Sequence, residues 1–254
     1  MKQRRVITVC GRYRSILTYT PITIEDVLHK SPYTRAAKQK ITTEARRKIN
    51  YANKTKQLER ILYGNFSGRD YYVTLTYDTE HTPNSRKEAR KNVRKFLKSL
   101  RRVRAASGDI LKYIYTTEGK HGAGLLHHHV FINATARNDL RDFIYLWGYA
   151  AENGVDIRPI EDGDNDIHTR ATYSTKEIKD NGEQSYTCSR NLIRPETAYS
   201  WKDGSAQEET PAGAVELSRE IKETAYGAFY YLEYLLPEIG SSPAAACRRY
   251  ARST

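Results

Sequence analysis

Three consecutive histidines stand inside an apolar run, LLHHHVFIN, at residues 125–133. The run has the composition of a buried strand, in which successive side chains point to opposite faces of a sheet. His127 and His129 then share one face, while His128 lies among apolar neighbours on the other. Two imidazoles on one face can hold a metal ion, and they can equally be sheet residues satisfied by local hydrogen bonds.

A carboxylate on the preceding strand would complete a metal site. The run ILKYIYTTE at 110–118 predicts that strand, and the glycine-containing loop after it predicts a hairpin with 125–133. If Glu118 pairs with His127, it joins His127 and His129 on one face, and a slip of one residue would remove it. Two imidazoles and a carboxylate suit a divalent cation and admit Mg²⁺ or Mn²⁺.

The sequence TYSTKE at 172–177 offers a nucleophile. On a helix, Tyr173 and Lys176 are three residues apart and share a face. A phenol is a poor nucleophile at neutral pH because its pKa is about 10. A nearby lysine and a metal-polarised phosphate would help the hydroxyl attack phosphorus. The chain has 20 tyrosines, so by itself Tyr173 is equally explained as a structural residue.

The elements around these residues predict an α+β fold. An alternating run marks a half-buried strand at 71–77, and Ser85 with Glu88 forms a capping box for a helix with one apolar face and ten basic residues. The order of elements is β-α-β-β-α-β, which is typical of a ferredoxin-like or RRM-like antiparallel sheet with one face free for a ligand. The predicted strands are 71–77, 110–118, 125–133 and 154–160, and the predicted helices are 85–106 and 139–150.

Extensions flank this predicted central domain, which spans 63–200. Residues 1–62 hold two short β-like runs and a long basic helix at 34–62. Residues 201–254 hold a linker and a tyrosine-rich amphipathic helix at 215–237. We expect that helix to pack on the core, because its aromatic side chains would be a large patch to leave exposed.

The net charge of +12 is unevenly distributed, since residues 1–110 carry 26 Lys+Arg against 9 Asp+Glu. This excess favours nucleic acid as a partner over a merely solvated surface. Exposed aromatic side chains stack on unpaired bases. Trp201 is a candidate for such stacking, whereas Trp147 lies on an amphipathic helix and is expected in the core. No run is long and apolar enough to span a membrane, so we expect a cytoplasmic protein with no membrane partner.

Three short motifs, taken in order, resemble those of the HUH endonucleases, the rolling-circle replication initiators (Rep proteins) of phages, plasmids and small single-stranded DNA viruses. They are YVTLTYD at 72–78, GLLHHHVFIN at 124–133 and YSTKE at 173–177, and SRNLIRP at 189–195 is similar to phage-type members. The resemblance covers roughly residues 60–196. It implies that the central domain is a nuclease.

The resemblance also implies roles for individual residues. His127, His129 and Glu118 would hold Mg²⁺ or Mn²⁺. Tyr173 would be the catalytic tyrosine, and Lys176 the lysine of the same motif. The residues expected to contact DNA are Thr74 and Thr76 in the first motif, Arg90, Arg94, Lys98 and Arg101 on the basic helix, and Ser189 and Arg190 in the last motif.

Two positions depart from the family pattern. His128 stands where the family has a hydrophobic residue, so a metal pair that includes His128 stays open. YSTKE holds one tyrosine, whereas some initiators have two. The implied reaction is a metal-dependent transesterification at a replication origin in single-stranded DNA, which leaves a 5′-phosphotyrosine and a free 3′ hydroxyl and can rejoin ends.

The partners implied are single-stranded DNA, a host polymerase and a separate helicase, because the chain has no P-loop motif. A relaxase or a transposase would use the same chemistry. A non-catalytic single-stranded nucleic-acid-binding module also suits a basic, RRM-like sheet. Such modules carry aromatic residues on the open face of the sheet, where this chain is expected to have Thr and His.

Overall fold

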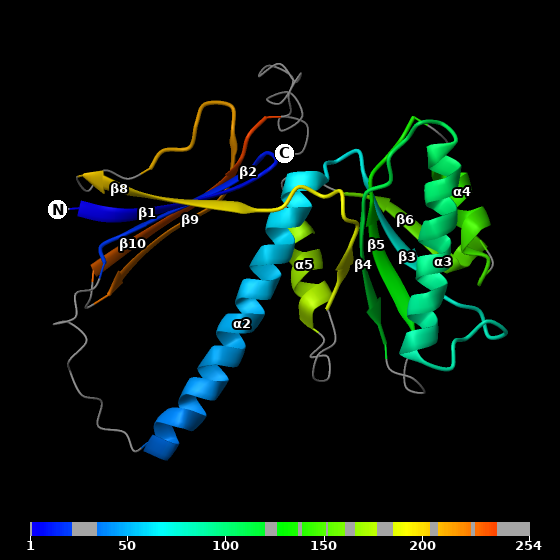
Figure 1. Ribbon diagram of the computed structural model, residues 1–254, viewed down its shortest axis with the longest axis horizontal. Coiled ribbons are helices and arrows are strands. Elements are labelled where there is room, and N and C mark those ends of the chain that lie inside the picture. Colours follow the sequence, from blue (N-terminus) through cyan, green and yellow to red (C-terminus); the bar gives the residue numbers. More distant parts are fainter. Residues whose placement is uncertain are drawn as a thin grey trace, which may run out of the picture. The chain divides into compact units, whose positions relative to one another are not determined.

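A computed structural model describes residues 2–21, 35–119, 126–136, 139–150, 152–160, 166–176, 185–203, 208–224 and 227–237. The chain divides into two compact units, which are coloured along the sequence in Figure 1. The central unit is Phe66–Leu192. The terminal unit combines Met1–Asn65 with Ile193–Thr254, so the two ends of the chain, predicted as separate extensions, belong to one unit.

The central unit has the predicted α+β architecture. Its elements are β3 (Tyr71–Leu75), α3 (Arg86–Ala105), β4 (Tyr113–Glu118), β5 (His127–Ile132), α4 (Asp139–Trp147), a short 3-10 turn (Glu152–Gly154), β6 (Val155–Pro159), α5 (Asp166–Lys176) and β7 (Thr187–Cys188). The strands are antiparallel and lie in the order β6-β3-β5-β4-β7. The first six strands and helices confirm the β-α-β-β-α-β order, and none of the helices in the described ranges is long and apolar enough to cross a membrane.

Helices α3 and α4 cover one face of this sheet, and α5 lies on the other (Figure 1). The α3 helix begins where predicted, because the Ser85 side chain accepts a hydrogen bond from the backbone N–H of Glu88. The apolar stripe of α3 then packs against alternate residues of the strands. The core on this side includes Val73, Leu75, Ala89, Val93, Phe96, Leu97, Leu100, Val130, Ile132, Phe143 and Trp147.

A fully buried ion pair joins α3, α4 and the end of β5. The Arg104 guanidinium donates to an Asp139 carboxylate oxygen at 2.9 Å. It also donates to the side-chain and backbone oxygens of Asn133, both at 2.8 Å. A buried charge is tolerated when it is paired and hydrogen-bonded in this way, so the three residues fix the relative positions of the two helices.

The terminal unit is a second antiparallel sheet with one long helix. Its elements are β1 (Lys2–Cys10), β2 (Tyr13–Tyr19), α2 (Arg35–Asn65), β8 (Glu196–Asp203), β9 (Val215–Thr224) and β10 (Gly227–Leu235), with strand order β8-β1-β2-β10-β9. The two N-terminal strands and the long helix confirm the prediction for this part of the chain. The helix packs on the sheet near its C-terminal end, where Tyr63 stacks on Tyr13 and Lys56 forms an ion pair with Glu233.

The predicted helix at 215–237 is wrong, because this segment forms the hairpin of β9 and β10. Gly227 sits at the start of β10 with φ of +126°, a conformation that favours glycine and would interrupt a helix. The run that follows it is rich in aromatic residues, which suit a strand. β10 pairs with β2, so the aromatic side chains are accommodated in a sheet rather than on a helix that packs on the core.

Candidate active site

The register between β4 and β5 is the predicted one. Glu118 lies opposite His127, and Thr116 lies opposite His129. Residues that face each other across antiparallel strands point to the same side of the sheet. Glu118, His127 and His129 therefore share the face on which α5 lies.

These three side chains form a cluster that could hold a metal ion. The Glu118 Oε2 atom is 3.9 Å from Nε2 of His127 and 3.7 Å from Nε2 of His129. One ligand atom from each residue lies within 4.8 Å of the other two. Glu118 is 4% exposed, and a carboxylate in such a place is stabilised by a nearby cation. Two imidazoles and a carboxylate therefore fit a divalent cation with positions left for substrate oxygen or water.

Neighbouring side chains orient His129. Its Nδ1 atom lies 3.2 Å from the hydroxyl of Thr74, so that Nε2 is the nitrogen facing Glu118. The ring of Tyr72 stacks on the imidazole at 5.3 Å between centroids. Burial, together with the nearby His127, lowers the pKa of His129 to about 4. The imidazole is therefore neutral at pH 7, which is the form that binds metal.

His128 does not belong to the cluster. It points to the opposite face of the sheet and is fully buried. Its Nε2 atom lies 2.8 Å from the Tyr77 hydroxyl and its Nδ1 atom 3.0 Å from the Thr117 hydroxyl. Because both ring nitrogens are engaged there, the pairing that involves His128 is excluded by this geometry, and the pair on the open face is His127 with His129.

Tyr173 stands beside the cluster on α5. Its ring meets the ring of His129 edge-on, with 6.0 Å between centroids. Ile167 and Ala171 are buried and anchor the helix, whereas Tyr173 is 52% exposed. The tyrosine is thus held at the cluster and is still accessible to a DNA backbone. Lys176 is the last residue of α5, and its side chain lies outside the part of the chain that the structure describes.

Sequence reasoning missed Arg170, one turn before Tyr173 on the same helix. Its guanidinium carbon lies 3.9 Å from the centre of the Tyr72 ring, which in turn stacks on His129. Burial raises the pKa of Tyr72 well above its usual range, and Arg170 opposes that shift. The spacing of three residues on a predicted helix was the signal that could have found Arg170, because it is the same spacing that linked Tyr173 to Lys176.

The structure does not bring the other predicted DNA contacts to this cluster. The basic residues of α3 lie on the helix that covers the opposite face of the sheet. Thr76 donates its hydroxyl hydrogen to the backbone oxygen of Gly154, and the buried Ser189 accepts from the backbone N–H of Tyr113. DNA binding stays a prediction for Thr76, Arg90, Arg94, Lys98, Arg101, Ser189 and the exposed Arg190.

The fold and the site together define an α+β protein with a candidate His-His-Glu metal centre beside an accessible tyrosine. A family model for replication-associated proteins of the ORF2 type matches residues 70–182, a segment that contains the whole cluster and Tyr173. Over this segment the chain is similar to a family of replication proteins, which is consistent with a role in initiating replication. No curated protein and no solved structure matches the chain.

Proposed function

We propose that this chain is an HUH-type endonuclease that initiates rolling-circle replication by nicking single-stranded DNA at an origin. The observation that carries the proposal is the convergence of His127, His129 and Glu118 on one face of the sheet, with Tyr173 in contact with His129. The match to a replication-associated family over residues 70–182 supports it.

The chemical step is an exchange of phosphodiester bonds. The Tyr173 hydroxyl oxygen attacks phosphorus and forms a phosphotyrosine bond, while the bond from phosphorus to the 3′ oxygen breaks. The phenol loses its proton, and the leaving 3′ oxygen gains one and departs as a hydroxyl. Because one ester replaces another, the step is reversible and the same site can rejoin ends. The free 3′ hydroxyl can prime a host polymerase, and a separate helicase would open the duplex.

The residues around the cluster have distinct tasks in this reaction. His127, His129 and Glu118 would hold Mg²⁺ or Mn²⁺, which when bound would polarise a non-bridging phosphate oxygen and stabilise developing charge. Thr74 and Tyr72 fix the orientation of His129. Lys176 would stabilise the phosphotyrosine.

The alternative of a non-catalytic RRM-like module has less support. Such modules present aromatic side chains on the central strands for base stacking. Tyr72 on β3 and Phe131 on β5 lie on the relevant face, but both are buried. A relaxase or a transposase would share the chemistry proposed here and differ in the DNA that it processes.

A covalent adduct is the direct test. The full chain is incubated with Mn²⁺ and a pool of single-stranded oligonucleotides of random sequence, and the intact protein is weighed by mass spectrometry. We expect a mass increase equal to the 3′ portion of a cleaved oligonucleotide, with the modified peptide containing Tyr173. Tyr145 on α4, which is 84% exposed, serves as the matched control tyrosine and should stay unmodified. An adduct on another tyrosine, or none with any DNA, would contradict the proposal.

A further inference from the structure

A row of aromatic and basic side chains crosses the sheet of the terminal unit. Trp201 on β8 lies opposite Arg4 on β1, and Arg4 lies opposite Tyr19 on β2. Tyr19 in turn lies opposite Phe229 on β10. Directly opposed residues of antiparallel strands point to the same face. These four side chains, together with Tyr199 two residues before Trp201, are called the aromatic row below.

The members of the aromatic row hold one another in place. The Arg4 guanidinium lies 5.2 Å from the centre of the Tyr199 ring and 5.5 Å from that of Trp201. The rings of Tyr19 and Phe229 stack at 5.8 Å with only 16° between their planes. Tyr199 is 65% exposed and Trp201 58% exposed. Large flat rings are thus presented to solvent in fixed positions beside a cation.

The same face is basic and partly covered by α2. The buried Tyr13 and Glu233, further along the same strands, contact Tyr63 and Lys56 of that helix. α2 carries the exposed cations Arg46, Lys48 and Lys54, and Lys222 on β9 lies opposite Phe229 at the end of the aromatic row. The exposed rings therefore adjoin positive charge, as a polyanion with flat bases requires.

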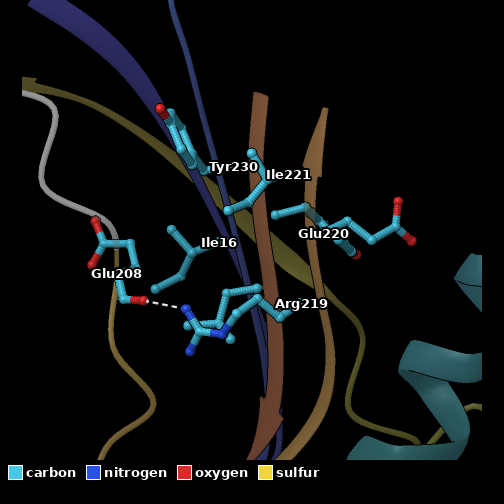
Figure 2. A pocket seen from close by; sticks show the side chains of 8 residues that line it. Ile16, Glu208, Arg219, Glu220, Ile221 and Tyr230 are labelled. Atoms are coloured by element: carbon cyan, nitrogen blue, oxygen red, sulfur yellow. Dashed lines mark hydrogen bonds between the residues drawn. The ribbon is translucent and has the colours of Figure 1, made fainter. Parts of the chain in front are cut away.

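The opposite face of this sheet is occupied by the chain itself. Figure 2 shows a small pocket there, in which the Arg219 guanidinium donates to the backbone oxygen of Glu208 beside Ile16. The Glu208 carboxylate also forms ion pairs with Arg5 and Lys202. Cations on that face are neutralised by an acid of the same unit, which distinguishes it from the face of the aromatic row.

We propose that the aromatic row is a second binding site, at which unpaired bases of single-stranded DNA stack on Trp201 and Tyr199 while Arg4 and the cations of α2 contact phosphates. Sheets that present aromatic rings between basic residues bind single strands in this manner and with little sequence preference. The site is separate from the tyrosine of the nuclease centre, and it rests on the proposed function only in the choice of DNA as the polymer.

The two tryptophans of the chain make this proposal directly measurable. Trp147 is buried in the central unit and donates its indole N–H to the backbone oxygen of Thr76, whereas Trp201 is exposed. Addition of oligothymidine to the full chain should quench tryptophan fluorescence, because a stacked thymine contacts Trp201. The Trp201→Phe variant should lose the quenching and keep most of the affinity, since phenylalanine can still stack.

Truncation of the aromatic row should weaken binding. Trp201→Ala and Tyr199→Ala should each raise the Kd for fluorescein-labelled oligothymidine roughly 5- to 100-fold, the effect of losing one stacked base. Tyr145→Ala, which removes an exposed ring from the central unit, should leave the Kd within about twofold. Circular dichroism melting curves check that each variant is folded.

The outcomes separate this proposal from the nuclease proposal. With saturating DNA, the Trp201→Ala variant should still form the covalent adduct, while Tyr173→Phe should bind oligothymidine normally and form none. Unchanged affinity in Trp201→Ala and Tyr199→Ala, with no quenching in the wild type, would overturn the DNA site. A changed sedimentation coefficient in those variants with unchanged DNA affinity would assign the aromatic row to protein contacts and would also overturn it.

Discussion

The ring of Tyr173 stands edge-on to the imidazole of His129, with 6.0 Å between the two centroids. One residue comes from a helix and the other from a central strand, and the contact sets the phenol beside the candidate metal ligands. The imidazole is itself held by Thr74 and Tyr72. A nucleophile so placed needs little reorganisation to reach a phosphate bound at the cluster.

Removing the Tyr173 hydroxyl should separate chemistry from binding. Tyr173→Phe keeps the ring and its contact with His129 but has no oxygen to attack phosphorus, so covalent adduct should fall below detection. The affinity for single-stranded DNA, measured by fluorescence anisotropy, should stay within about twofold of wild type. Tyr145→Phe is the control and should form adduct normally. Cleavage at the wild-type rate by Tyr173→Phe would place the nucleophile elsewhere.

The metal cluster predicts a graded loss of cation affinity. Glu118→Gln and His129→Ala each remove a ligand and should weaken Mn²⁺ binding, measured by calorimetry, by more than Thr74→Val does. Thr74→Val leaves the ligands in place and removes the hydroxyl beside Nδ1 of His129, for which a loss of about 10- to 100-fold is expected.

The same ligands predict that EDTA abolishes adduct formation by the wild type. His128→Gln is the control for all three variants, because His128 lies on the opposite face and its replacement should leave Mn²⁺ affinity unchanged. Equal affinity in Glu118→Gln and wild type would remove the carboxylate from the site.

Arg170 is expected to assist catalysis. Its guanidinium lies on the ring of Tyr72, one turn of helix from Tyr173, where it can stabilise charge on the reacting phosphate. Arg170→Ala should slow single-turnover cleavage by about 10²-fold, as loss of one donor to a developing oxyanion does, and Arg170→Lys should recover part of the rate. Mn²⁺ affinity should change little. Arg158→Ala, an exposed arginine on β6, is the control, and an equal effect there would refute a specific role for Arg170.

The buried ion pair of Arg104 and Asp139 should dominate the stability of the central unit. Asp139→Ala leaves the guanidinium buried without its carboxylate and should lower the free energy of unfolding by about 3–5 kcal/mol. The double variant Arg104→Met with Asp139→Leu should lose much less, because no charge is stranded. Urea unfolding followed by Trp147 fluorescence measures both. A larger loss in the double variant than in Asp139→Ala would contradict this account.

His128 predicts a loss of stability in acid. Burial lowers its pKa to about 3, while an unfolded histidine titrates near about 6.5, so protons bind more tightly to the unfolded chain. The stabilisation is therefore complete above about pH 6.5 and is lost as the pH falls toward about 3. In EDTA, the wild type should lose stability more steeply over this range than His128→Gln. Parallel curves for the two proteins would show that His128 is protonated in the fold.

Much of the central unit could be predicted from the sequence because its local signals agree with one another. The alternation of His127, His128 and His129 along a strand fixed which two share a face, and the hairpin fixed Glu118 as their neighbour. The role of the basic α3 helix could not be predicted in this way. Ten positive charges suggest contact with DNA, but the apolar stripe of the same helix decides which face of the sheet it covers.

The terminal unit was harder to predict because its sheet depends on pairings between distant segments. The segment at 215–237 has enough apolar residues at helical spacing to suggest a helix, and only Gly227 and the aromatic run argue for a hairpin. β8 was missed altogether, although Thr197, Tyr199 and Trp201 alternate as a strand requires. Neither segment reveals from its own residues that β1 and β2 are its partners.

The terminal unit also imposes an order on how a newly made chain can mature. β1 and β2 leave the ribosome first, yet their outer neighbours β8 and β10 follow only after the entire Phe66–Leu192 unit has been synthesised. The early hairpin must wait with both edges unpaired, a state that invites wrong pairing with other chains. Slow translation or truncation before Leu235 would therefore leave the nuclease unit complete and the first-made strands prone to aggregate.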